Sequence, residues 1–153
     1  MPHLRTKYFG ELTYGADAML HFPAGIPGFE HEKSFLLIQQ DRTRPLTFMQ
    51  SAITPDLCFL ALPVQTISPE FRLRLATEDR AELALPPGRQ PVIGKDVLCL
   101  SLVTLGEEEP PTINLMAPIV VNLKNRRAVQ AIQFDSGYPL HQPLESEEVE
   151  ALC

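Results

Sequence analysis

The segment Val97-Leu98-Cys99-Leu100-Ser101-Leu102-Val103 decides the fold class, because it is apolar at both odd and even positions. Successive side chains of a strand point to opposite faces of a sheet. This composition therefore predicts a strand that is covered on both faces, and we expect it to lie centrally in its sheet. Further strands must then come from the rest of the chain.

Fifteen prolines leave few windows that are long enough for a helix, because an interior proline removes a hydrogen bond and clashes with the preceding turn. The short runs between them are rich in β-branched and aromatic residues, which favours strands. The expected strands are residues 7–14, 18–22, 35–39, 46–52, 57–62, 71–75, 97–105, 113–116, 119–123 and 129–134. This pattern predicts an all-β protein with an antiparallel barrel or sandwich.

Apolar and basic residues alternate strictly over residues 71–75. We expect Phe71, Leu73 and Leu75 to face the core, since alternate side chains of a strand share one face. The two arginines between them are then exposed to water. The sequence predicts a half-exposed strand here.

Two short helices are expected outside the strands. One covers residues 77–85, where Thr77 can cap the first turn and Pro86-Pro87-Gly88 ends the helix. Residues 144–153 form an acidic C-terminal tail, in which a second helix over residues 146–152 is short and terminal.

At 153 residues, the chain is expected to fold as a single domain, which we place at residues 1–143. The net charge of −6 repels phosphate backbones and anionic lipid, so we expect no direct binding of nucleic acid or membrane. The first residues lack the apolar core of a signal peptide, and no apolar run approaches the length of a membrane span. This favours the cytoplasm.

Histidine, cysteine and acidic residues show no spacing typical of a metal or catalytic centre. The histidines lie in separate segments: His3, His21, His31 and His141. Without His-x-x-x-His, Cys-x-x-Cys or an Asp-rich calcium loop, we expect no metal site and no cofactor. We expect no enzyme either. The enzymatic alternative requires a pocket near His21, Cys58 or His141.

Prolines and glycines dominate the segment Phe22-Pro23-Ala24-Gly25-Ile26-Pro27-Gly28-Phe29-Glu30. It is not a phosphate-binding loop, because it lacks the Gly-Lys-Ser/Thr ending and no helix follows. Proline fixes φ and glycine permits positive φ, so the segment is expected to be a rigid loop that holds its apolar side chains in place. Such a loop is either a core plug or a binding ridge.

Three longer strings occur in order along the chain: Thr6-Lys7-Tyr8-Phe9-Gly10-Glu11, the segment Phe22 to Glu30 quoted above, and Asn114-Leu115-Met116-Ala117-Pro118-Ile119-Val120-Val121-Asn122. Shorter strings accompany them: Met49-Gln50-Ser51, Lys124-Asn125-Arg126, Gln130 and Asp135-Ser136-Gly137-Tyr138. With this order and spacing, the chain from about residue 6 to residue 143 resembles the flagellar assembly factor (FliW) family. Residues 84–96 depart from the pattern, with three prolines and two glycines where a plainer acidic stretch is expected.

The resemblance implies a monomeric, antiparallel barrel-like fold with one or two short helices and a role in protein binding. Members of the family bind CsrA, a basic dimeric RNA-binding repressor of flagellin translation, and they also bind free flagellin. When flagellin is scarce, the factor binds CsrA and keeps it from the message. When flagellin is abundant, flagellin binds the factor and CsrA represses translation again. The negative charge of this chain suits an antagonist of a basic protein. A flagellin-binding chaperone that does not bind the regulator remains an alternative.

The residues that match the family supply the candidate partner-binding residues: Tyr8, Phe9, Ile26, Phe29, Asn114, Asn122, Lys124, Asn125 and Arg126. We expect Tyr8 and Phe9 on opposite faces of a strand, one in the core and the other available to a partner. Asn114 and Asn122 flank a strand pair broken by a proline, where asparagine amides can also satisfy backbone groups. For these two residues, the structural interpretation is favoured.

Lys124, Asn125 and Arg126 are expected to form an exposed polar turn after a strand. Arginine is enriched among the residues that dominate binding energies at protein interfaces. We therefore expect charge reversal at Arg126, or Ile26→Asp in the proline-glycine loop, to weaken partner binding. We expect the thermal stability of both variants to stay within about 1 kcal/mol of the parent, which is the scale of an ordinary surface change.

Overall fold

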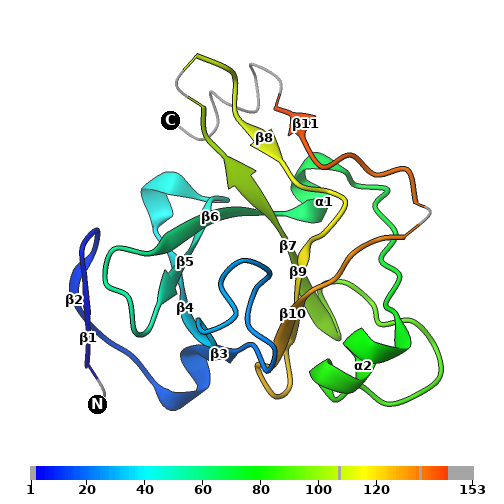
Figure 1. The fold of residues 1–153 in the computed structure, drawn as a ribbon, viewed down its shortest axis with the longest axis horizontal. Helices are drawn as coiled ribbons and strands as arrows, with labels where there is room; N and C mark the ends of the chain where they lie inside the picture. The colour runs from blue at the N-terminus through cyan, green and yellow to red at the C-terminus, as the bar shows by residue number, and fades with distance from the viewer. Residues whose placement is uncertain (1–2, 107, 135, 145–153) are drawn as a thin grey trace.

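The computed structural model of the protein describes residues 3–106, 108–134 and 136–144 (Figure 1). Strands dominate these residues. They are β1 (His3–Thr6), β2 (Gly10–Thr13), β3 (Met19–His21), β4 (Ser34–Gln39), β5 (Thr47–Ser51), β6 (Cys58–Pro63), β7 (Val97–Thr104), β8 (Thr112–Ile113), β9 (Ile119–Asn122), β10 (Ala128–Gln130) and β11 (Gln142–Pro143). The described residues also contain two α-helices, α1 (Val64–Ile67) and α2 (Thr77–Leu83), and two 3₁₀ turns, Ala16–Ala18 and Asp41–Thr43. The fold is all-β, as predicted.

The main sheet follows the order β10-β9-β7-β6-β5-β4-β3, and its neighbouring strands are antiparallel. The two ends of this order meet, because the His21 N–H donates to the Arg126 carbonyl at 2.9 Å. A single bridge pairs His21 with Arg127 there. The sheet therefore curls into a barrel-like shape without a continuous ladder between its first and last strands.

Strand β7 has three strand partners, β6, β8 and β9. Its residues Val97 and Cys99 belong to one hydrophobic cluster, whereas Leu100 belongs to another on the opposite face. The predicted coverage of this strand on both faces is therefore confirmed.

Two clusters of apolar side chains lie on the two faces of the sheet. The inner cluster includes Phe35, Met49 and Leu100. It surrounds the loop between β3 and β4, which Figure 1 shows in the middle of the ring of strands. The outer cluster includes Val97, and it is covered by α2 and by residues 71–75. A small third cluster lies beneath the β1–β2 hairpin.

The expected single strand over residues 7–14 is wrong, because the chain reverses within it. Strands β1 and β2 form a two-stranded antiparallel hairpin, and Lys7, Tyr8 and Phe9 make its turn. The Thr6 hydroxyl accepts a hydrogen bond from the Phe9 N–H at 2.9 Å and donates to the Gly10 carbonyl at 2.8 Å. Gly10 has a φ of 67°, a conformation that glycine adopts without strain.

Residues 71–75 are extended but are not a strand of the sheet. Phe71, Leu73 and Leu75 are nonetheless buried and the arginines between them are exposed, as the alternation predicted. The side chain of Gln133 replaces a neighbouring strand: its amide oxygen accepts from the Arg74 N–H at 2.8 Å and its amide nitrogen donates to the Arg74 carbonyl at 2.9 Å. Alternation therefore predicted burial correctly and backbone pairing incorrectly.

Helix α2 begins and ends differently from the expectation. Its N-cap is Ala76 with no side-chain cap bond, so Thr77 is the first helical residue and does not cap it. The helix ends at Leu83, two residues early, because Ala84 turns into the left-handed region with a φ of 55°. Within the described residues, no helix is long and apolar enough to cross a membrane.

The expected helix over residues 146–152 lies outside the described residues. Leu144, which the sequence assigned to the tail, is 3% exposed and belongs to the outer hydrophobic cluster. Leu144 therefore packs with the domain core in this structure.

Candidate protein-binding surfaces

Ile26 lies inside the barrel rather than on a ridge. Residues 22–30, which we call the plug loop, carry Ile26 at 2% exposure and Phe22 at 1% into the inner hydrophobic cluster. The Phe22 ring packs edge-on against Phe35, with 5.4 Å between centroids. Of the two interpretations of this loop, the structure supports the core plug. Ile26 offers almost no surface to a partner, and the expectation that Ile26→Asp is structurally mild is wrong.

Gly25 is the position where the plug loop requires glycine. It has a φ of 72°, and a Cβ atom placed there would lie 2.4 Å from the Glu30 carbonyl oxygen. Phe29 is half-buried, and its ring packs edge-on against Phe59 at 5.3 Å between centroids. The loop is thus folded tightly upon itself and against the strands.

The turn between β9 and β10, residues 122–127, holds the C-terminal end of α2. We call it the clamp turn. The side-chain amides of Asn122 and Asn125 both donate to the Leu83 carbonyl, at 2.9 and 3.2 Å, and the Arg127 guanidinium donates to the Glu82 carbonyl. The last carbonyls of a helix have no partner within the helix, so these side chains satisfy them. Asn122 is 5% exposed, and its role in this structure is that of a helix cap.

Asn114 has a comparable local role. Its side-chain oxygen accepts a hydrogen bond from the Ala117 N–H at 2.9 Å, and its own N–H donates to the Leu102 carbonyl at 3.0 Å. These bonds shape the chain just before the proline at position 118. The structural interpretation of Asn114 and Asn122 is thereby supported.

Lys124 and Asn125 are exposed at the clamp turn, and Arg126 is half-buried with a φ of 64°. Lys124, Asn125 and Asn122 line a hollow of about 800 Å³. Leu123 lies on the same side of the hollow as these three residues. The other side comes from the loop that follows α2, with Ala84, Leu85, Pro86, Lys95 and Asp96. This hollow is where three of the nine candidate residues come together.

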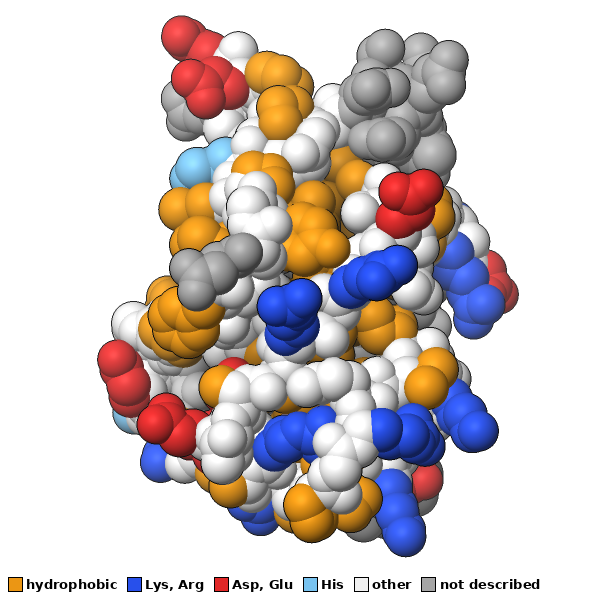
Figure 2. Space-filling view, turned by 90° about the vertical axis from the view of Figure 1, so that its right-hand side faces the viewer, with side chains coloured by type: hydrophobic (Ala, Val, Ile, Leu, Met, Phe, Trp, Pro, Cys, Tyr) orange, Lys and Arg blue, Asp and Glu red, His pale blue; other side chains and the backbone are white. Residues whose placement is uncertain are grey.

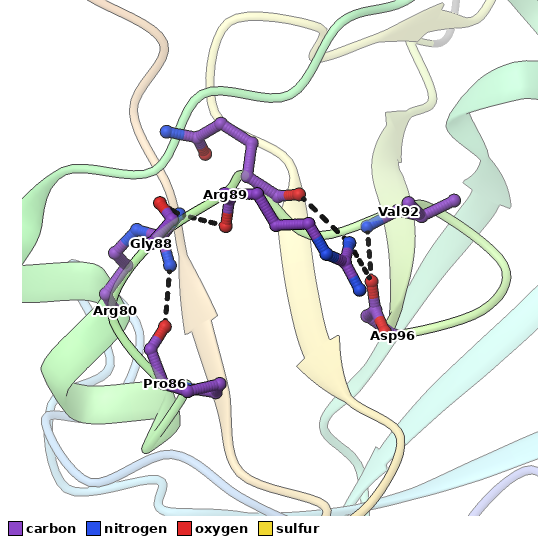
Figure 3. Close-up of polar contacts among 7 residues, drawn as sticks. Arg80, Pro86, Gly88, Arg89, Val92 and Asp96 are labelled. Carbon is purple, nitrogen blue, oxygen red and sulfur yellow. Dashed lines mark hydrogen bonds and ion pairs between the residues drawn. The ribbon is translucent and has the colours of Figure 1, made fainter.

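The loop of residues 84–96, which departs from the family pattern, is held by two arginines (Figure 3). Arg80 donates to the carbonyls of Pro86, Gly88 and Arg89, the first two at 3.1 and 3.2 Å. Arg89 pairs with Asp96 at 3.1 Å. A hydrogen bond from the Val92 N–H, aided by Arg89, lowers the pKa of the Asp96 carboxyl. The loop therefore presents a fixed wall to the hollow.

The hairpin turn, residues 7–9, presents an exposed aromatic candidate, Tyr8. Tyr8 is 59% exposed, and Ile53 in the loop after β5 is 63% exposed. The Lys7 N–H donates to the Pro55 carbonyl at 2.9 Å, which joins the turn to the loop after β5. Phe9 packs edge-on against Phe48 at 5.1 Å between centroids. Tyr8 is therefore exposed and Phe9 half-buried, but both lie in a turn and not on opposite faces of a strand, and partner binding by Tyr8 stays a prediction.

A buried polar cluster under the loop after β5 escaped the sequence analysis. Glu32 is fully buried, and its carboxylate accepts hydrogen bonds from the hydroxyls of Ser51 at 2.6 Å and Thr54 at 3.1 Å. The side-chain nitrogen of Gln50 lies within hydrogen-bonding distance of three carbonyls, those of Ser51, Thr54 and Pro55. The matched string Met49-Gln50-Ser51 was the only signal, and the cluster explains why a rigid loop needs those residues.

The enzymatic alternative requires a pocket near His21, Cys58 or His141. None of these three residues lines the hollow beside the clamp turn or a second hollow next to the plug loop. Burial raises the pKa of the Cys58 thiol to about 11 and that of Cys99 to about 12, which disfavours the nucleophilic thiolate. A hollow of about 210 Å³ is lined by Glu30, Asp79 and Glu82, and desolvation together with Glu82 and Glu78 raises the pKa of Asp79. Within the described residues, no group of three His, Cys, Asp or Glu side chains could hold a metal ion.

A family model described as FliW protein matches residues 3–144 of the chain. The chain belongs to the FliW family. A flagellar assembly factor FliW of Bacillus subtilis (strain 168) is 32% identical over 145 residues, which cover 94% of this chain and 97% of the relative. The protein of that name from Pseudothermotoga lettingae is 38% identical over 148 residues, covering 94% and 88%.

A solved FliW structure has the same fold. The crystal structure of the flagellar assembly factor FliW superposes with a TM-score of 0.81 at 29% sequence identity, covering 96% of this chain and 99% of that one. The FliW match spans the plug loop, the clamp turn and the hairpin turn alike. The family resemblance read from the sequence is confirmed.

Proposed function

We propose that this protein is a flagellar assembly factor that binds a CsrA-type translational regulator and releases it when free flagellin binds. The observation that carries the proposal is the FliW match over residues 3–144. It acts as a binding protein without a cofactor, as a monomer in the cytoplasm, where the message and unassembled flagellin occur. The net charge of −6 favours encounter with a basic regulator and disfavours contact with RNA.

The partner-binding candidates reduce to exposed residues of two surfaces. One is the hairpin turn with Tyr8, and the other is the hollow beside the clamp turn with Lys124 and Asn125. The half-buried Arg126 follows these two residues in the clamp turn. Tyr8 supplies apolar area on a side chain with few rotatable bonds, a property of residues that dominate interface energies. The buried Ile26 and the hydrogen-bonded Asn114 and Asn122 stabilise the fold that positions these surfaces.

A competition titration tests the proposal. Labelled RNA is bound to CsrA from the same organism, this protein is added, and flagellin from that organism follows. We expect loss of RNA binding on the first addition and recovery on the second. RNA binding that is insensitive to this protein, or protein that binds the RNA itself, contradicts the proposal.

A flagellin-binding chaperone without regulator binding is the second candidate function. It differs in one measurable respect, because calorimetry would then detect flagellin binding and no CsrA binding. Each tenfold difference in affinity corresponds to about 1.4 kcal/mol, so a few contacts shared by the two partners suffice for a switch. A calorimetric titration with CsrA, repeated in the presence of flagellin, therefore separates the two candidate functions.

A further inference from the structure

Two extended segments that lie side by side expose alternate residues. In residues 71–75, Arg72 and Arg74 are exposed while their neighbours are buried. In residues 131–134, Ile132 is 41% and Phe134 is 68% exposed, while Ala131 and Gln133 are buried. We call Arg72, Arg74, Ile132 and Phe134 the arginine surface.

The bonds between Gln133 and the Arg74 backbone fix the two segments against each other. Stacking of Phe71 on Tyr138, with 4.5 Å between centroids, and a hydrogen bond from the Arg72 N–H to the Tyr138 hydroxyl at 3.0 Å add to this attachment. The arginine surface is therefore built on a rigid base.

The guanidinium groups of this surface lack partners within residues 3–106, 108–134 and 136–144. Neither Arg72 nor Arg74 makes an ion pair or a side-chain hydrogen bond there, whereas Arg44 pairs with Asp41 and Arg89 with Asp96. Figure 2 faces the side where these segments lie in Figure 1, and it shows Lys and Arg side chains exposed among hydrophobic ones. Arginine and aromatic residues together are typical of surfaces that bind protein. The complementary ligand is an acidic segment that also carries apolar side chains.

The chain itself contains such a segment. Residues 145–153 read Glu145-Ser146-Glu147-Glu148-Val149-Glu150-Ala151-Leu152-Cys153, with four glutamates, valine and leucine. They follow Leu144, which is buried in the hydrophobic cluster that also contains Phe71, Leu73 and Ala131. Nine residues reach about 30 Å when extended. A short tether provides an effective concentration in the millimolar range, so about 1 mM intrinsic affinity gives about half occupancy.

We propose that residues 145–153 dock on the arginine surface, with glutamates facing Arg72 and Arg74 and the apolar side chains covering Ile132 and Phe134. The docked tail shields an Arg-rich patch of an otherwise acidic protein.

Paramagnetic labelling of the full chain tests this. A nitroxide is attached to Cys153 in a Cys58→Ser background, where Cys99 is 1% exposed and unreactive. Amide signals of residues 72–74 and 132–134 should lose about half of their intensity or more, given about half occupancy. In Arg72→Glu/Arg74→Glu the loss should disappear, and it should weaken near 1 M salt, where the Debye length is about 3 Å.

The control Arg5→Glu/Arg42→Glu makes the same charge change at exposed residues elsewhere and should leave the loss intact. Because an arginine variant can perturb the fold, Phe134→Ser supplies a second variant that leaves the charges in place, and it should reduce the signal loss. Undiminished signals in the labelled parent, or losses that centre elsewhere, overturn the proposal. Signal loss only between a labelled and an isotope-enriched chain assigns the surface to a second copy and overturns docking within one chain.

Discussion

The plug loop and the hairpin turn carry similar residues but differ in how far their side chains are exposed. Each combines bulky apolar side chains with glycine, and each lies within residues 3–144, which the FliW family model matches. Yet Ile26 of the plug loop is 2% exposed, whereas Tyr8 of the hairpin turn is 59% exposed. Residue type does not separate a core contact from a binding contact. The difference arises from what surrounds each loop.

Surroundings differ because the plug loop enters a ring of strands and the hairpin turn lies at the edge of the molecule (Figure 1). Ile26 contacts side chains from several strands, so it contributes to stability. Tyr8 has a cation–π contact with Lys7 at 5.5 Å and is otherwise open to solvent. Substitutions should therefore affect stability in the first loop and binding in the second.

Ile26→Asp should have the largest effect. It places an unpaired carboxylate in the inner hydrophobic cluster and should lower the free energy of unfolding by about 4 kcal/mol or more. Urea denaturation followed by circular dichroism measures the change. The matched control is Ile53→Asp at a 63% exposed position, which should stay near the parent value. Similar stabilities of the two variants would remove the distinction between the loops.

Gly25→Ala should destabilise the protein by about 2 kcal/mol or more, because the new Cβ meets the Glu30 carbonyl in a left-handed conformation. Gly28→Ala is the control, since its φ is also positive at 87° but its Cβ would meet nothing within 4 Å. It should cost about 1 kcal/mol, the ordinary penalty of that conformation. Equal losses in thermal unfolding would show that close approach is unimportant.

Asn122→Ala extends the test to the clamp turn. It removes the bonds to the Leu83 carbonyl and from the Lys124 N–H, and should cost about 1 to 3 kcal/mol. Hydrogen exchange at α2 should rise with it. Asn125→Ala, at an exposed position, should cost less. A variant Asn122→Ala of parental stability that loses partner affinity would make Asn122 an interface residue.

Tyr8→Ala should have the smallest effect on stability, within about 0.5 kcal/mol, because the side chain is exposed. Affinity for CsrA or flagellin should nonetheless fall about tenfold, or about 1.4 kcal/mol, if Tyr8 is an anchor at the interface. Calorimetry with each partner gives the affinity. Phe9→Ala is the comparison variant, and it should lose stability because it removes the contact with Phe48. Parental affinity of Tyr8→Ala for both partners would exclude the hairpin turn from the binding surface.

Candidate residues could be chosen from the sequence, but their roles could not. Asn122, Asn125 and Lys124 are adjacent in the chain, and the structure places them at one hollow. Only the fold shows that the two amides are bonded to Leu83, about forty residues earlier in the chain. The burial of Glu32 could not be predicted, because a carboxylate in a loop is usually solvated. Its hydrogen bonds with Ser51 and Thr54 are known only from the structure.

By itself the sequence determined the all-β class, the strand covered on both faces, the alternating burial of residues 71–75 and the family. These properties follow from local periodicity, proline spacing and strings of residues, which need no knowledge of distant contacts. Tertiary structure alone decided that residues 7–9 form a turn, that Ile26 points inward and that Gln133 substitutes for a strand. Those outcomes depend on which segments meet in space, and segments far apart in the chain are brought together only by the tertiary fold.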